Sequence, residues 1–89
     1  MVSLSFAPEA DEFVSELEVT PTRIRLLGEI NTDLDLLERD PSDFRCRRRR
    51  FSNIVCWAIS LEIERQEWLI LWEESQDGSV IVRAIIPAP

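Results

Sequence analysis

The spacing of apolar residues changes once along the chain, and this change limits the possible folds more than any other feature. Between residues 8 and 39, apolar side chains recur every three or four positions, which is the period of an amphipathic helix. From Ile54 onward they alternate with other side chains or form one short continuous run, as they do in strands. The sequence therefore predicts an α+β domain in which helices precede most of the strands.

The first half of the chain is expected to form a short strand and a helical hairpin. Val2, Leu4 and Phe6 alternate with small or polar residues and predict the strand. Pro8 marks the start of the first helix, because a proline at the first helical position loses no hydrogen bond. Thr20 and Pro21 repeat this signal for a second helix that runs to about residue 39. The apolar stripe predicted for this helix consists of Ile24, Leu27, Ile30, Leu34 and Leu37, and Leu26 and Leu36 widen it.

Three further strands are expected in the second half. One alternates from residue 54, and the next, Trp68 to Trp72, is apolar at every position, which is typical of a central strand covered on both sides. Asp77 and Gly78 predict a hairpin before the last strand, in which Val80, Val82, Ala84 and Ile86 share a face. The predicted order is β-α-α-β-β-β, with an N-terminal helical hairpin packed on an antiparallel sheet of about four strands. Residues 1–89 are expected to form a single domain.

The residue types that the chain lacks exclude several kinds of chemistry. There is no histidine, lysine or tyrosine, so a Ser-His-Asp triad, a Cys-His pair, a Schiff base and a P-loop lysine are all excluded. Cys46 and Cys56 are too few to form a structural zinc site, and we expect one surface thiol and one packed thiol. The sequence thus predicts no metal, no cofactor and no catalytic residue. The N-terminus lacks the features of a signal peptide, so a cytoplasmic location and no membrane contact are expected.

A block of arginines, FRCRRRRF at residues 44–51, interrupts an acidic chain of net charge −7. Five arginines occupy six positions: Arg45, Arg47, Arg48, Arg49 and Arg50. Three interpretations remain open: pairing with the protein's own acids, contact with RNA phosphates, or contact with an acidic protein partner. Arg83, in the last predicted strand, is a further candidate for binding an anion.

The acidic half of the chain suggests an alternative function. Residues 1–43 carry eleven Asp or Glu and three Arg, a net charge of −8. A non-catalytic interaction module or inhibitor could use this surface to bind a basic partner. The residues proposed to carry that contact are Asp11, Glu12, Asp33 and Asp35.

Two segments of the chain resemble the RelE/ParE superfamily of bacterial type II toxin–antitoxin systems. They are LSFAPEADEFVSEL at residues 4–17 and CWAISLEIERQEWLILWEESQDGSVIVRAI at residues 56–85. The resemblance implies a toxin that binds a cognate antitoxin and acts on the ribosome and its mRNA or on a protein target, without direct contact to DNA. The mRNA-cleaving members use lysines, arginines and often a tyrosine or histidine, and Leu69 stands here where the family pattern has an arginine. A ribosome-dependent endonuclease therefore remains an open alternative to a toxin that only binds.

Overall fold

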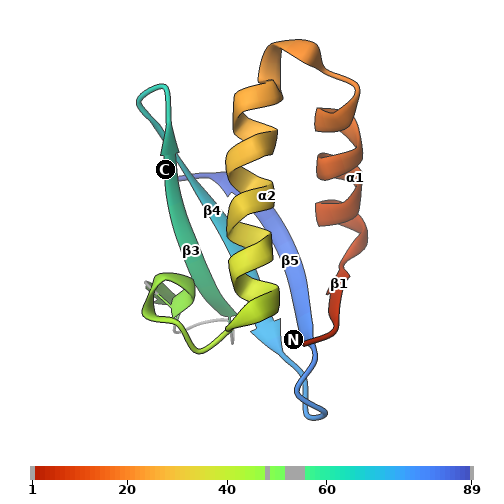
Figure 1. The fold of residues 1–89 in the computed structure, drawn as a ribbon, viewed down its shortest axis with the longest axis vertical. Helices are drawn as coiled ribbons and strands as arrows, with labels where there is room; N and C mark the ends of the chain where they lie inside the picture. The colour runs from red at the N-terminus through yellow and green to blue at the C-terminus, as the bar shows by residue number, and fades with distance from the viewer. Residues whose placement is uncertain (1, 48, 52–55, 89) are drawn as a thin grey trace.

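The computed structural model describes residues 2–47, 49–51 and 56–88. Two helices, α1 (Pro8–Glu18) and α2 (Ile24–Arg39), lie side by side on one face of a twisted sheet (Figure 1). The sheet consists of β1 (Leu4–Phe6), β2 (Arg49–Phe51), β3 (Cys56–Ile63), β4 (Gln66–Glu74) and β5 (Val80–Pro87). Two short 3-10 helices, η1 (Pro21–Arg23) and η2 (Phe44–Arg47), precede α2 and β2. The α+β class and the N-terminal helical hairpin are confirmed.

The sheet has the strand order β1-β5-β4-β3-β2, and it differs in two details from the prediction. β1 pairs with β5 in parallel, whereas the other pairs are antiparallel. The reason is visible in Figure 1: the helical hairpin returns the chain to the end where β1 began, and the third strand of the meander then runs in the direction of β1. The second difference is β2, a fifth strand formed within the arginine block. The predicted strand start at Ile54 lies outside the described residues.

The core lies between the helices and the sheet. Its central side chains are fully or almost fully buried, and each such aliphatic or aromatic group contributes roughly 1.5–3 kcal/mol. They are Leu17, Ile30, Leu37, Ile70, Trp72 and Val82. The indole Nε1 of Trp72 donates a hydrogen bond of 2.7 Å to the backbone oxygen of Cys46, so this buried polar group is satisfied and η2 is attached to the sheet.

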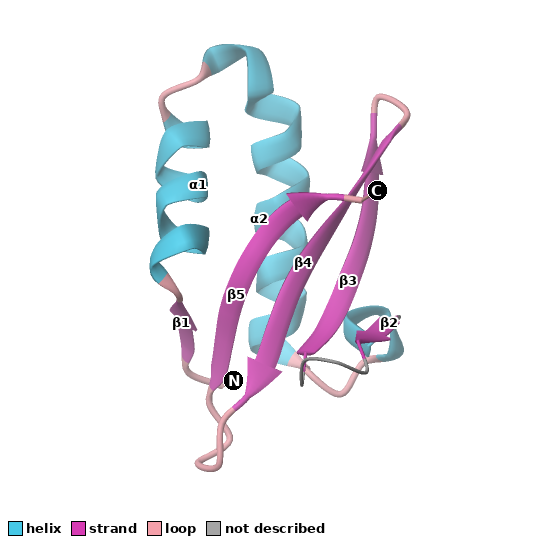
Figure 2. Cartoon of the chain, turned by 180° about the vertical axis from the view of Figure 1, so that it is seen from behind, coloured by secondary structure: helices cyan, strands magenta, loops and turns pink. Residues whose placement is uncertain are grey.

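β4 lies at the centre of the sheet, and its residues 69–72 are buried on both faces, as predicted, while Trp68 is half-buried. Both described helices cover only one of these faces, and Figure 2 shows the other from behind. On that face Ala58, Leu69 and Leu71 still form a second buried cluster, with Ala84 and Ala88 packed against it. No described helix is long and apolar enough to cross a membrane.

A β-bulge divides the last strand. Trp72 pairs with Val82 and Leu71 pairs with Ala84, so Arg83 is an extra residue between two successive pairs. Because of the extra residue, the side chains that follow it lie on the opposite face of the sheet from the one that regular alternation predicts. Val82 and Ile85 are therefore buried, whereas Ile86 is 37% exposed. The prediction that Val80, Val82, Ala84 and Ile86 share one face is wrong beyond residue 82.

The start of the second helix also differs from the prediction. Its first turn is the 3-10 helix η1, and the Thr20 hydroxyl donates to the backbone oxygen of Glu16 in α1 instead of capping the new helix. Ile24 is 70% exposed and is not part of the buried stripe, whereas Leu26, which was expected to widen the stripe, is buried. The cause is the spacing within α2: six residues before Ile30 place Ile24 about a third of a turn from it, whereas four residues place Leu26 almost directly in line with Ile30.

Candidate functional site

The arginine block divides between two elements. Arg45 and Arg47 belong to η2, and Arg49 and Arg50 belong to β2. Arg48 lies outside the described residues, and only the backbone pairing of Arg49 with Ala58 on β3 is described. β2 is the last strand in the order of the sheet, so the block lies along one edge of the molecule.

Arg45 is held by an acid of its own chain. Its Nε and one terminal nitrogen donate to the two carboxylate oxygens of Asp43, at 3.0 and 2.9 Å. This forked geometry is the strongest form of an arginine–carboxylate pair. The hydrogen bonds from Arg45 lower the pKa of Asp43 to about 2, so the pair is formed throughout the neutral range.

Arg47 is packed against the sheet. Its guanidinium carbon lies 5.1 Å from the ring centroid of Trp57 and 5.5 Å from that of Trp72. Its Nε donates to the backbone oxygen of Pro41 at 2.9 Å, and a terminal nitrogen lies 3.8 Å from the Glu74 carboxylate. The side chain therefore bridges η2 and two strands, which is a structural role.

Arg50 is the most available cation of the block for which a side chain is described. The register of β2 and β3 places it opposite Trp57, and its guanidinium carbon lies 4.5 Å from the centroid of that ring. The residue is exposed, and no carboxylate of the described residues lies within 4.0 Å of its guanidinium. Stacking on the indole holds a charged group at the surface in one place.

Arg83 is not brought together with Arg50. Its Nε lies 3.8 Å from the Glu73 carboxylate, and it belongs to the bulge of β5. β4 and β3 lie between β5 and β2, so the two backbones are separated by about 14 Å, which is three strand spacings. The predicted anion-binding residues thus do not form one site.

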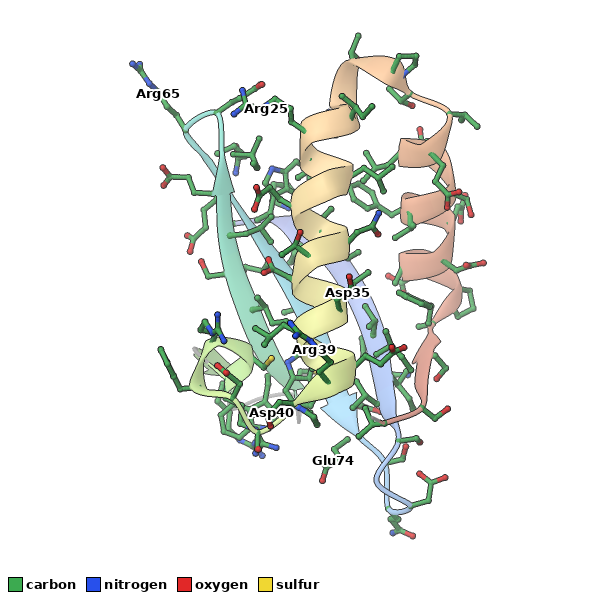
Figure 3. The ribbon with its side chains drawn as sticks, viewed as in Figure 1. Arg25, Asp35, Arg39, Asp40, Arg65 and Glu74 are labelled. Carbon is green, nitrogen blue, oxygen red and sulfur yellow. The ribbon has the colours of Figure 1, made fainter. Side chains whose placement is uncertain are left out.

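The acidic residues of the alternative site lie on the helical layer. Asp11 and Glu12 are exposed on α1, and Asp35 is exposed on α2, where Figure 3 labels it. None of the acids on these two helices forms an ion pair with a described residue. Asp33 is half-buried, and burial, with the nearby charge of Glu29, raises its pKa to about 6.

The two cysteines do not provide a reactive group. Both are free and buried, which corrects the expectation of one surface thiol. Burial, with the nearby acids Asp43 and Asp40, raises the pKa of the Cys46 thiol to about 11, so it stays protonated at neutral pH. Burial also raises the pKa of Cys56. Among the described residues, no group of three or more acids and cysteines is arranged to hold a metal ion.

Comparison with protein-family models, with curated proteins and with solved structures found no match to this chain. The site is therefore interpreted from its own geometry. That geometry reduces the predicted arginine site to the exposed Arg50 and the half-buried Trp57 on which it lies, which we call the Arg50–Trp57 patch. The sequence indicates Trp57 as a core or interface residue but does not pair it with the arginine block. The alternation of β3 could have suggested the pairing, because Trp57 lies near the start of that strand, next to the block.

Proposed function

We propose that the protein is a RelE/ParE-like component of a toxin–antitoxin pair that acts in the cytoplasm by binding a macromolecule and not by catalysis. Two features of the chain support the family. They are the order of its elements, in which one strand and two helices precede the strands β2 to β5, and the two segments that resemble family members. The chain has no histidine, lysine or tyrosine, so general acid–base catalysis would fall to carboxylates, arginines and thiols, which are less suited to it. This composition supports binding over mRNA cleavage.

The Arg50–Trp57 patch is the observation that carries this proposal. An exposed guanidinium held against an indole, with no acid of the described residues within 4.0 Å, is suited to a carboxylate of a partner. Arginine and tryptophan are also the residues that most often dominate binding energy at interfaces. An acidic protein partner such as an antitoxin segment fits better than RNA, since the net charge of −7 repels a polyanion.

A growth assay tests the toxin function. Induced expression of the wild-type protein is expected to slow growth of the host, and R50A is expected to relieve this effect. R39A is the matched control, because Arg39 is an exposed arginine at the end of α2 and no contact among the described residues joins it to Arg50 or Trp57. Normal growth under confirmed expression of folded wild-type protein contradicts the toxin function.

A second candidate function rests on the helical layer. The acids of α1 and α2 lack ion pairs with described residues, which favours contact with a basic surface. In that case the protein is a non-catalytic inhibitor, and D11K/E12K abolishes partner binding whereas R50A leaves it unchanged. Retained binding in D11K/E12K contradicts the candidate.

A further inference from the structure

A hollow lined mainly by polar and charged side chains lies at the opposite end of the molecule from the arginine block. It has a volume of about 270 Å³ and lies between η1, the start of α2 and the turn from β3 to β4. Figure 3 places Arg25 and Arg65 at this end, and Asp40 and Glu74 at the other. The polar and aromatic side chains that line the hollow are Thr22, Arg23, Arg25, Glu64, Gln66 and Trp68.

The two arginines of the hollow are held in different ways. The guanidinium carbon of Arg23 lies 5.8 Å from the Trp68 ring centroid, and that ring in turn lies 5.6 Å from the ring of Phe13. Arg25 has only a long contact of 3.8 Å to the Glu64 carboxylate, and the side chains are 75% and 69% exposed. A pair of this kind contributes little in water, so an anion with more charge can replace Glu64.

The turn that carries Glu64 has an unusual backbone. Glu64 and Arg65 have φ angles of 52° and 68°, in the left-handed region that residues other than glycine rarely adopt. This two-residue turn places Glu64 beside Arg25, while Figure 3 shows Arg65 pointing away from the molecule. Positive φ at both central residues is the favoured geometry of a two-residue hairpin, so the turn fixes the position of Glu64 at the edge of the hollow.

We propose that this hollow binds a phosphate group, free or as part of a small phosphate monoester. Two guanidinium groups, a threonine hydroxyl and a glutamine amide supply donors, and the α2 dipole adds positive potential at its start. Two arginines against one glutamate leave the hollow positive within an acidic chain. Its volume is close to the lower limit of ligand pockets, about 300 Å³, so the ligand is small. This site is separate from the Arg50–Trp57 patch and does not depend on the proposed function.

Titration of isotope-labelled protein with inorganic phosphate and with adenosine monophosphate, followed by NMR, tests the proposal. We expect saturable shifts of the amide signals of residues 22–26 and 64–66. Equal affinity for the two probes would show that the hollow recognises only the phosphate group. Tighter binding of adenosine monophosphate would show that it also recognises the rest of a phosphate monoester. Absence of saturable shifts at these residues with both probes overturns the proposal.

Three variants make the assignment specific. R25A is expected to weaken binding of the preferred probe about tenfold, because it removes a charge-assisted hydrogen bond. R39A removes the same charge from the other end of the same helix and is expected to leave the affinity unchanged. E64Q is expected to strengthen binding severalfold, because it removes the carboxylate that competes for Arg25. Equal affinities of R25A and R39A, or weaker binding in E64Q, overturn the proposal, and thermal melting verifies that each variant is folded.

Discussion

Arginines that are neighbours in the sequence have different surroundings in the fold. Arg45 is paired with Asp43, Arg47 is packed between η2 and two tryptophans, and Arg50 is exposed on one indole ring. The structural interpretation of the block therefore holds for the first two residues. The sequence could not separate Arg47 from Arg50, because their surroundings depend on how η2 and β2 pack against Trp57 and Trp72.

The Asp43–Arg45 pair predicts how stability changes in acid. The folded pKa of Asp43, about 2, lies below the ordinary value of 3.8, so the unfolded chain binds its proton first. The pair stabilises the fold above the ordinary pKa, and this contribution is lost as the pH falls through the folded value. D43N is expected to lose less stability than the wild type between pH 4 and pH 2 in urea unfolding. Parallel pH profiles of the two proteins contradict the prediction.

Asp33 predicts the opposite dependence. Its folded pKa, about 6, lies above the ordinary value of 3.8, so the folded state binds the extra proton between these values. Stability is therefore lost as the pH rises through this range. D33N is expected to be more stable than the wild type at pH 7 by about 1 kcal/mol, since partial exposure screens the effect, and equally stable below pH 4. A constant difference across this range contradicts the prediction.

At the scale of elements, short sequence signals predicted most boundaries. Pro8 begins α1, and Asp77 and Gly78 lie in the turn before β5, as their backbone preferences require. Gly28, inside α2, has no neighbour that requires a glycine, because a Cβ there would meet no described atom within 4 Å. The bulge at Arg83 was also missed, since the apolar pattern of β5 continues through it and only its pairing with β4 reveals the extra residue.

The attachment of η2 to the sheet can be measured by comparing two arginines. R47A removes contacts to two indoles and a hydrogen bond to Pro41, so it is expected to lower the free energy of unfolding by about 1–2 kcal/mol. R50A removes one exposed contact and is expected to cost about 0.5 kcal/mol or less. Chemical denaturation of both variants tests the difference, and equal losses would show that η2 is not held through Arg47.

The turn between β3 and β4 offers a stabilising substitution. Arg65 has a φ of 68°, which glycine adopts without steric cost. R65G is therefore expected to raise the free energy of unfolding by about 0.5–1 kcal/mol. D35G, at an exposed position of α2, serves as a control and is expected to lower it by about 0.3 kcal/mol. Lower stability of R65G than of the wild type contradicts the strain that we assign to this turn.

At the scale of the whole molecule, the charges are separated into distinct regions. Acids cover the helical layer, and Arg50 is exposed at one edge of the sheet. The positive hollow beside Arg23 and Arg25 lies at the far end of the molecule. The sequence predicted the two-layer fold and the acidic half. It did not predict the hollow, which is formed by residues 22–26 and 63–68 and exists only when the helical hairpin packs on the sheet.

The most direct test of the binding function is a pull-down with tagged wild-type protein, R50A and R39A from the native cell. Bound protein and bound RNA are both identified and quantified. We predict that the wild type and R39A retain a small DNA-binding protein encoded by a neighbouring gene, and that R50A loses most of it. If the wild type instead retains RNA, and R50A loses that RNA, the patch is the binding site but its target is RNA and not a protein. Equal recovery of one partner by all three proteins would contradict the role of Arg50, and an unrelated basic partner would assign the function to the acidic helices.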